Sequence, residues 1–179
     1  MNDYNTMPAA HHLELEGREK LTVSGVEDVE RFDETGIVMT TSAGTLVVTG
    51  EAFIRPSDFE QMKTTLVDGD GKPYKNGRNL AAGSVRLFDA GACLGRRLVF
   101  MPFNVLEGME EVPRKSERLK ALRPLGFLPC KYMVTKRPLT QEETEDGIRQ
   151  LKQYAADADI PIDGIVITYN DICLLYTSP

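Results

Sequence analysis

The first fifty residues alternate polar and apolar side chains, and this pattern suits strands with one buried face. Segments such as residues 20–23, 36–41 and 44–50 show the period of two, and glycines separate them. Successive side chains of a strand point to opposite faces, so the pattern predicts an antiparallel β meander. We expect the run from Gly44 to Ile54 to form one continuous strand. The acidic residues of this region are expected to form a solvated face and turns: Glu27, Asp28, Glu30, Asp33 and Glu34.

Helix signals begin after Glu51. Ser57 with Glu60, and Thr140 with Glu143, have the spacing of capping boxes. Ser116 is the expected cap of a third helix. We expect helices near residues 57–63, 78–88, 116–123 and 141–156. The last helix is expected to turn three apolar side chains inward, namely Ile148, Leu151 and Tyr154.

Strand-like segments alternate with these helices. We expect strands in residues 96–108, 131–137 and 164–169, and Pro102 indicates a bulge or an edge strand in the first of them. Mixed strands and helices after an all-β start give an α+β fold class. The change of character near residue 50 makes two origins or two domains plausible.

Composition excludes several classes of protein. A chain of 179 residues with a net charge of −6 is long enough for a buried core, and its charge argues against bulk affinity for nucleic acid. No apolar run approaches the length of a membrane span. Three widely spaced cysteines (Cys93, Cys130 and Cys173) predict reduced thiols in a cytoplasmic protein. With two histidines only, a His-based zinc site has little material.

The run from Asn76 to Arg86, NGRNLAAGSVR, places an arginine on either side of a patch of very small residues. Small residues let two backbones approach closely, and alanines favour a helix despite Gly83. Arg78 and Arg86 can offer forked donors to a phosphate or a carboxylate. The residues themselves leave two readings open, an anion site or internal ion pairs that only hold the fold.

This run resembles the N-P-R-N-x-A-A-G-S-x-R motif of the adenylation domain of NAD-dependent DNA ligases, with Gly77 in place of the proline. The resemblance implies a nucleotide-binding role for Arg78 and a phosphate or DNA contact for Arg86. It extends over about residues 50–172, and it implies an incomplete nucleotidyltransferase fold.

Two further segments agree with this resemblance. Residues 48–53, VTGEAF, resemble the family's V-R-G-E-x-F strand, which implies that Glu51 binds the ribose hydroxyls of the adenosine. Residues 162–168, IDGIVIT, resemble the segment I-D-G-V-V-x-K and make Asp163 the third nucleotide-binding residue. Thr168 stands where most members carry a lysine.

The nucleophile of the family is the lysine of a K-x-D-G motif, and these 179 residues contain no such motif. We therefore assign no catalytic residue and no metal ligand. The parent family uses NAD and Mg²⁺ to transfer AMP and to seal nicked DNA in replication and repair. We expect this chain to be an inactive fragment that binds neither cofactor by itself.

Residues 11–51 resemble a different family, the YabP-like sporulation proteins, through SGVEDVERFDE and GTLVVTGE. The last residues, CLLYTSP, resemble translated adapter read-through, and the alternative is an ordinary C-terminal strand. The expected organisation is therefore a YabP-like segment (1–50), a partial ligase adenylation domain (51–172) and a non-native tail (173–179), joined somewhere within 44–54. The alternatives to a ligase fragment are a non-enzymatic sporulation protein with protein partners, or an intact binding protein on a ligase scaffold.

Overall fold

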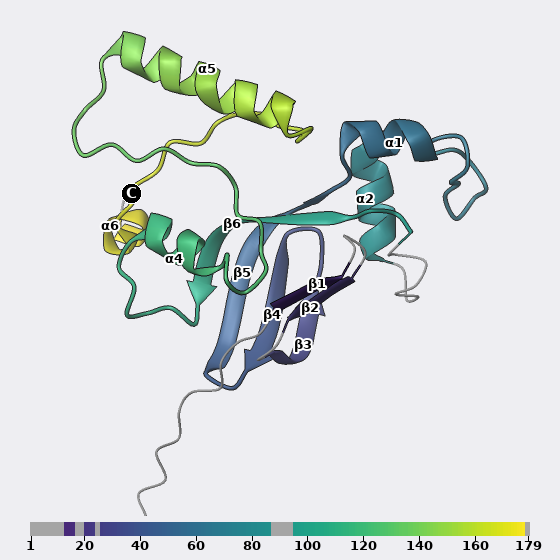
Figure 1. Cartoon of the computed structure of the whole chain (residues 1–179), viewed down its shortest axis with the longest axis horizontal. Helices are drawn as coiled ribbons and strands as arrows, with labels where there is room; N and C mark the ends of the chain where they lie inside the picture. The colour runs from purple at the N-terminus through teal and green to yellow at the C-terminus, as the bar shows by residue number, and fades with distance from the viewer. Residues whose placement is uncertain (1–12, 17–19, 24–25, 87–94, 178–179) are drawn as a thin grey trace, which may run out of the picture.

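The computed structural model describes residues 13–16, 20–23, 26–86 and 95–177 of the chain. Its centre is a four-stranded antiparallel sheet in the order β3-β4-β5-β6 (Figure 1). The strands are β3 (Val26–Phe32), β4 (Gly36–Thr41), β5 (Gly44–Phe53) and β6 (Val99–Glu107). A separate two-stranded sheet pairs β1 (Leu13–Glu16) with β2 (Lys20–Val23). The predicted α+β class and the β-only start are confirmed.

Strand β5 shows why the alternating pattern predicts this sheet. Its buried residues recur at every second position, at Leu46, Val48 and Gly50, and the residues between them are more exposed. The tight turn before it uses Gly44 at φ 118°, a conformation that favours glycine. The strand continues to Phe53, so the expected continuous strand from Gly44 is confirmed.

Strand β6 forms one edge of the sheet and carries a bulge at the predicted proline. Thr49 of β5 faces Asn104, whereas Gly50 faces Pro102, so Phe103 is the extra residue. A proline has no N–H to donate, and edge strands and bulges are the places where a sheet accepts it. The prediction for Pro102 is confirmed on both counts.

The main core lies between the sheet and the helix α4 (Lys115–Ala121). Val48 and Val105 of the sheet are fully buried together with Leu122, which follows α4, and Leu119 joins them. Burying a side chain of this size contributes roughly 1.5–3 kcal/mol. This cluster therefore fixes α4 on the sheet.

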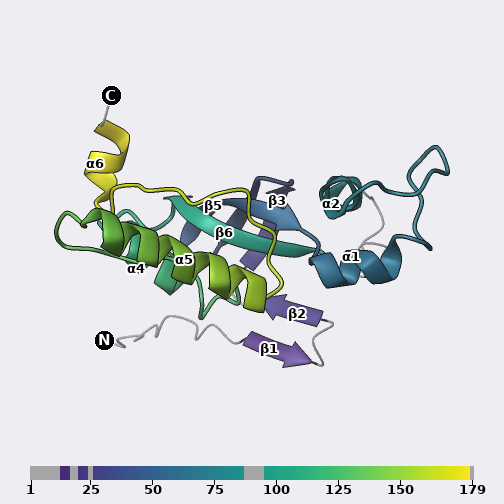
Figure 2. The ribbon, with the colours of Figure 1, turned by 90° about the horizontal axis from the view of Figure 1, so that it is seen from above.

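The described residues form four further helices: α1 (Pro56–Met62), α2 (Gly77–Val85), α5 (Gln141–Asp157) and α6 (Ile172–Thr177). Three of the four predicted helices are found within two residues of their expected bounds. The fourth, expected at 78–88, begins at Gly77 and ends at Val85, three residues early; positions 87 and 88 lie outside the described residues. Figure 2 shows α1 and α2 at one end of the molecule and α6 at the other, and Figure 1 shows α5 lying apart from the sheet. No helix in the described ranges is long and apolar enough to cross a bilayer.

Two of the predicted helix caps, Ser57 and Ser116, are wrong. Helix α1 begins one residue before Ser57, with Arg55 at the N-cap position, so the Ser57 hydroxyl lies inside the first turn and bonds a distant residue. Helix α4 has Arg114 at its N-cap, and the Ser116 amide donates to the side chain of Asn170 at 2.9 Å. The Thr140 and Glu143 capping box is present as predicted.

The predicted strands at residues 131–137 and 164–169 are wrong as well. Both segments are extended, but they form no ladder with any described residue. Helix α5 turns little of its surface inward, since Ala155 is its buried residue and Tyr154 is 38% exposed. The final segment is helical through Thr177, so the alternative of a C-terminal strand is also wrong; residues 178–179 lie outside the described part.

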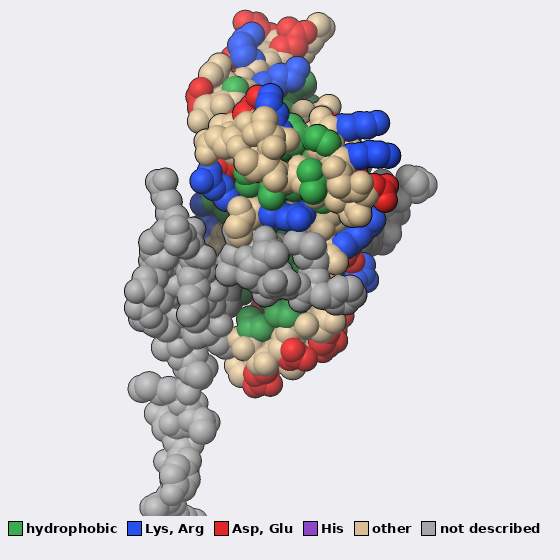
Figure 3. Space-filling model, turned by 90° about the vertical axis from the view of Figure 1, so that its right-hand side faces the viewer, with side chains coloured by type: hydrophobic (Ala, Val, Ile, Leu, Met, Phe, Trp, Pro, Cys, Tyr) green, Lys and Arg blue, Asp and Glu red, His purple; other side chains and the backbone are tan. Residues whose placement is uncertain are grey.

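The expected acidic face is found at the β3 side of the sheet. Glu27, Asp28 and Glu30 are exposed, and Asp33 forms the turn after β3 by accepting from the amide and hydroxyl of Thr35 at 2.9 and 2.7 Å. In the view of the α1 and α2 side, acidic side chains gather at the lower end of the molecule, and lysines and arginines lie above them (Figure 3).

Candidate functional site

Helix α2 carries the small-residue motif and begins at a side-chain cap. The Asn76 side chain accepts a hydrogen bond from the Asn79 amide at 2.8 Å. A Cβ at Gly77 would lie 3.4 Å from the Ile54 carbonyl oxygen, and one at Gly83 would lie 2.7 Å from the Tyr74 hydroxyl. The small residues therefore let α2 approach both the end of β5 and the loop before it, as the sequence predicts.

Arg78 and Asp163 come together in the structure. Nη1 of Arg78 lies 3.8 Å from Oδ2 of Asp163, and both side chains are largely exposed. Arg78 is in the first turn of α2, whereas Asp163 lies in the extended segment after α5. Two of the three residues that the family resemblance assigns to the nucleotide are thus neighbours, although they are far apart in the chain.

Glu51 is exposed on β5, where it faces Met101 of β6. The neighbouring Gly50 is buried, and a Cβ there would lie only 2.5 Å from the Met101 carbonyl oxygen, so a side chain has no room. Within the described part of the chain, the Glu51 carboxylate forms no ion pair with Arg78, whose guanidinium pairs with Asp163 instead. Helix α2 packs on β5, so Glu51 belongs to the strand that supports the motif.

Arg86, at the end of α2, pairs with Glu34 at 3.5 Å and keeps 74% of its side chain exposed. Its outer side borders a shallow hollow of about 520 Å³ between α2 and the loop of residues 67–74. The hollow does not include Glu51, Arg78 or Asp163. The structure therefore separates the two arginines of the motif, with Arg78 beside Asp163 and Arg86 beside the hollow.

Sequence reasoning missed two residues of this hollow. Arg96 lies over the ring of Tyr74, 5.7 Å from its centroid, and donates to the Tyr74 hydroxyl at 3.3 Å. An arginine held in this way keeps a fixed direction and a partly used set of donors. The run RR at residues 96–97 was a visible signal, but nothing in the sequence placed it beside α2.

Thr168 and the lysines near the α2 motif lie in exposed segments. Thr168 is exposed in the extended segment after α5. Lys63 follows α1 and pairs with Glu60, and Lys72 and Lys75 lie exposed in the loop before α2. No group of three His, Cys, Asp or Glu side chains that could hold a metal ion occurs among the described residues.

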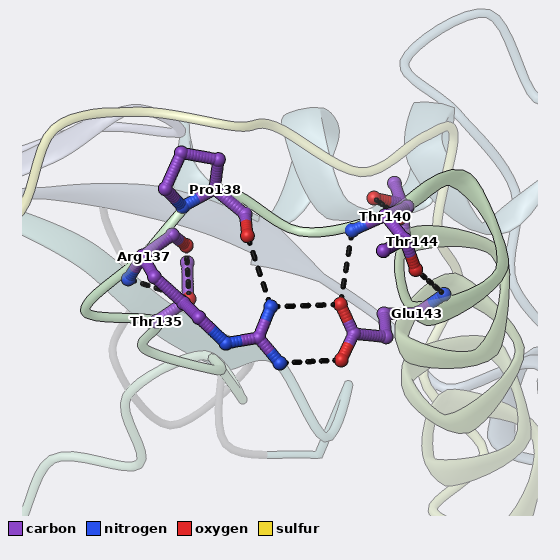
Figure 4. Close-up of polar contacts among 6 residues, drawn as sticks. All are labelled: Thr135, Arg137, Pro138, Thr140, Glu143 and Thr144. Atoms are coloured by element: carbon purple, nitrogen blue, oxygen red, sulfur yellow. Dashed lines mark hydrogen bonds and ion pairs between the residues drawn. The ribbon is translucent and has the colours of Figure 1, made fainter.

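An ion pair with additional hydrogen bonds fixes the start of α5, the helix that precedes Asp163 in the chain. The Arg137 guanidinium pairs with both carboxylate oxygens of Glu143, at 2.9 and 2.5 Å, and also donates to the Pro138 carbonyl (Figure 4). The Thr140 amide donates to the same carboxylate at 2.9 Å. The Arg137 guanidinium, followed by the Thr140 amide, lowers the pKa of Glu143 to about 2. Glu143 is therefore ionised at neutral pH.

Comparison with known proteins gives a family for this arrangement. The family model of the NAD-dependent DNA ligase adenylation domain matches residues 27–177 of this chain. The match takes in β3, β4 and β5 as well as α2 and Asp163. It therefore includes part of the segment that resembles YabP-like proteins, and the comparisons give that second resemblance no support.

Curated relatives agree with this match. The chain is 35% identical to a DNA ligase of Lachnoclostridium phytofermentans over 132 residues, 32% to one of Campylobacter concisus over 129, and 35% to one of Bacillus pumilus over 127. These alignments cover 70–72% of this chain but only 19–20% of each relative. The chain thus spans about a fifth of the length of the relatives it matches. The family match covers most of the chain, and the protein belongs to the family of NAD-dependent DNA ligase adenylation domains.

Proposed function

We propose that this chain is the later part of a ligase adenylation domain and that its site contributes to holding the adenosine half of NAD. The approach of Arg78 to Asp163 at 3.8 Å supports the proposal, because both positions match motifs of the family and they come from different elements. In the whole protein, the proposed activity is transfer of AMP from NAD and sealing of nicked DNA.

Each site residue has a chemical role in this proposal. The Glu51 carboxylate can accept hydrogen bonds from two ribose hydroxyls. Arg78 offers forked donors to a phosphate, and Asp163 holds that guanidinium in place. Arg86, paired with Glu34 and largely exposed, is proposed to contact a phosphate of the nucleotide or of DNA.

The described residues fit the adenosine end of NAD better than its reacting end. An exposed carboxylate and an exposed guanidinium are present, but the chain has no K-x-D-G motif, and Thr168 replaces the usual lysine. The lysines near α1 and α2 are exposed, whereas a nucleophilic amine must be aligned with the α-phosphate and have its pKa lowered. Mg²⁺ would supply neutralising charge at the phosphates when bound. We propose no covalent step on this chain.

A labelling experiment tests the proposed inactivity. The purified chain is incubated with adenine-labelled NAD and Mg²⁺ and separated by denaturing electrophoresis, with a full-length relative as positive control. We expect no labelled band from this chain. A labelled band that survives alkali, is lost in acid as a lysine phosphoramidate is, and maps to a lysine within residues 50–172 would show that the nucleophile has been misjudged.

A segment exchange tests the nucleotide role. Residues 50–172 replace the corresponding segment of the Lachnoclostridium phytofermentans ligase, so that the rest of that enzyme supplies what this chain lacks. We expect the hybrid to form labelled enzyme, and Glu51→Gln or Arg78→Ala to reduce labelling by about a hundredfold, a loss typical of a removed charged contact. Glu107→Gln, at an exposed position of β6, is the control. Equal labelling by the Glu51→Gln and Glu107→Gln hybrids would remove Glu51 from the site.

A join within residues 44–54 is a separate proposal. The resemblance of residues 11–51 to YabP-like proteins supports it, whereas the ligase match from residue 27 weighs against it. Sequencing single DNA molecules across codons 44 to 54 decides between them, because continuous coverage in a natural gene would exclude a join made during assembly. The cytoplasmic location and any protein partners stay predictions.

A further inference from the structure

The turn after α5 contains an unusual residue for its position. Helix α5 ends in a Schellman motif, in which the Asp159 amide donates to Ala156 and the Ile160 amide donates to Ala155, at 3.2 and 2.8 Å. Asp159 has φ 54°, in the left-handed region. Glycine is the usual residue there, because a side chain in that conformation costs roughly 1–2 kcal/mol. An aspartate at this position is therefore explained by what its carboxylate does.

The carboxylate of Asp159 binds the first turn of α1. Its Oδ2 accepts from the Ser57 amide at 3.0 Å and from the Ser57 hydroxyl. Beside it, the Arg55 guanidinium donates to the Ala158 carbonyl oxygen. These contacts join segments that are more than a hundred residues apart in sequence. We call the four residues Arg55, Ser57, Ala158 and Asp159 the α1–α5 latch.

Helix α1 is also the support of α2. A Cβ at Gly77 would lie 3.7 Å from Cβ of Phe59, and Phe59 packs against the cluster that contains Leu80. The start of α2, with Arg78, is thus fixed on α1 from one side. The α1–α5 latch binds Asp159, four residues before Asp163, to the same helix α1. The three residues between Asp159 and Asp163 form no helix or strand.

We propose that Asp159 is a positioning residue, which holds the segment of Asp163 beside Arg78 by binding the first turn of α1. The role of that pair in nucleotide binding rests on the function proposed above, but the positioning itself does not. The bonds from the Ser57 hydroxyl and amide, with the charge of Arg55, lower the pKa of Asp159, in agreement with an ionised carboxylate in the latch.

Proximity of the two segments is the direct readout. Arg78→Cys and Asp163→Cys are combined in a chain whose native cysteines are replaced, and the rate of cross-linking by a short bismaleimide is measured. Removing the Arg78–Asp163 ion pair in this way leaves the latch to hold the segments together. Glu34→Cys with Arg86→Cys is the matched control, since that pair also lies close in space but involves neither α1 nor α5.

The Asp159→Gly variant removes the carboxylate of the latch and keeps the end of helix α5. Glycine satisfies the left-handed turn but has no carboxylate, so α5 should keep its end and the thermal midpoint should not fall. We expect cross-linking between positions 78 and 163 to slow by about tenfold, as the effective concentration of the released segment falls. Ser57→Ala should slow it similarly, and Ser57→Thr should restore it. The control pair should not change.

Three outcomes would overturn the proposal: an unchanged 78–163 rate with Asp159→Gly, an equal slowing of the control pair, or no rescue by threonine. None of these measurements contains a nucleotide. A negative cross-linking result would therefore not contradict the nucleotide role of Glu51 and Arg78, which the segment exchange tests. A negative result of that exchange would not contradict the positioning role of Asp159.

Discussion

Val48 and Val166 both lie in apolar runs that the sequence predicts as strands, and their surroundings differ completely. Val48 in β5 is 0% exposed between two paired neighbours, whereas Val166 is 86% exposed in the segment after α5. The same contrast separates the paired strands (β3 to β6) from the extended segments (residues 128–135 and 160–169). In the first of these, one backbone bond, from Cys130 to Pro102 at 2.8 Å, reaches the sheet. An apolar run becomes a strand only where a partner lies beside it.

The largest effect should come from a methyl group placed in the β5–β6 ladder. In Gly50→Ala, the new Cβ would lie 2.5 Å from the Met101 carbonyl oxygen and 2.7 Å from the Phe100 ring. We expect the free energy of unfolding to fall by about 3 kcal/mol in denaturant titration, because backbone must shift. Gly164→Ala meets no atom within 4 Å and should change it by less than about 0.5 kcal/mol. Similar losses for both would show that residues 160–169 are packed as tightly as the sheet.

A second pair of variants compares the two valines directly. Val48→Ala removes two buried carbons and leaves a cavity, so we expect a loss of about 2–3 kcal/mol in the free energy of unfolding. Val166→Ala should cost less than about 0.5 kcal/mol, since its side chain is already in water. Thermal and denaturant unfolding of both variants check this. A large loss for Val166→Ala would mean that this segment is covered in solution.

Acid titration gives the smallest effect and compares a carboxylate beside the sheet with one in α5, the helix between the two extended segments. Thr35, in the turn after β3, lowers the pKa of Asp33 to about 2, and Arg137 lowers the pKa of Glu143 to about 2. Their ordinary values are 3.8 and 4.5. Because each folded pKa is the lower one, each group stabilises the fold above its ordinary pKa, and this is lost as the pH falls toward 2. Both midpoints should appear near 2 by NMR.

Arg137→Gln sharpens that titration. Without the guanidinium, the pKa of Glu143 should return toward 4.5, while Asp33 should still titrate near 2, because its partners lie in another turn. A shift of both midpoints would mean that the two regions are coupled through the sheet.

Local chemistry explains what the sequence could predict. The alternation in β5 and the capping box of Thr140 depend on neighbours in the chain, and both are found. Residues 131–137 and 164–169 carry the same kind of apolar signal, but a pattern does not state whether a partner strand is present. The neighbours of Ser57 in the chain predict a helix cap. Its actual partner is Asp159, which no local rule can find.

The sequence also predicts the residues of the candidate site better than their arrangement in space. The motif around α2 identified Arg78 and Arg86, and the family segment identified Glu51 and Asp163. The 3.8 Å approach of Arg78 to Asp163 agrees with a shared site for these two, whereas the nucleotide-binding role of Glu51 stays a prediction. Arg86 follows Arg78 by about two helical turns, so α2 itself keeps them apart. The place of Arg86 beside the hollow depends on how α2 lies against the loop of residues 67–74. That arrangement follows from the contact of Gly83 with Tyr74, which joins residues on two elements.

The pairing of Phe53 with Val99 also bears on the order in which the molecule forms during synthesis. Strands β3, β4 and β5 are joined by short turns, so their hairpins can form as soon as residue 53 is available. Strand β6 can join them only when residues 54–98 have been made and closed into a loop, which carries an entropic cost that grows with its length. Arg78 lies within that loop, and Asp163 is made later still. We therefore expect a nascent chain to hold a finished three-stranded sheet well before its two site residues meet.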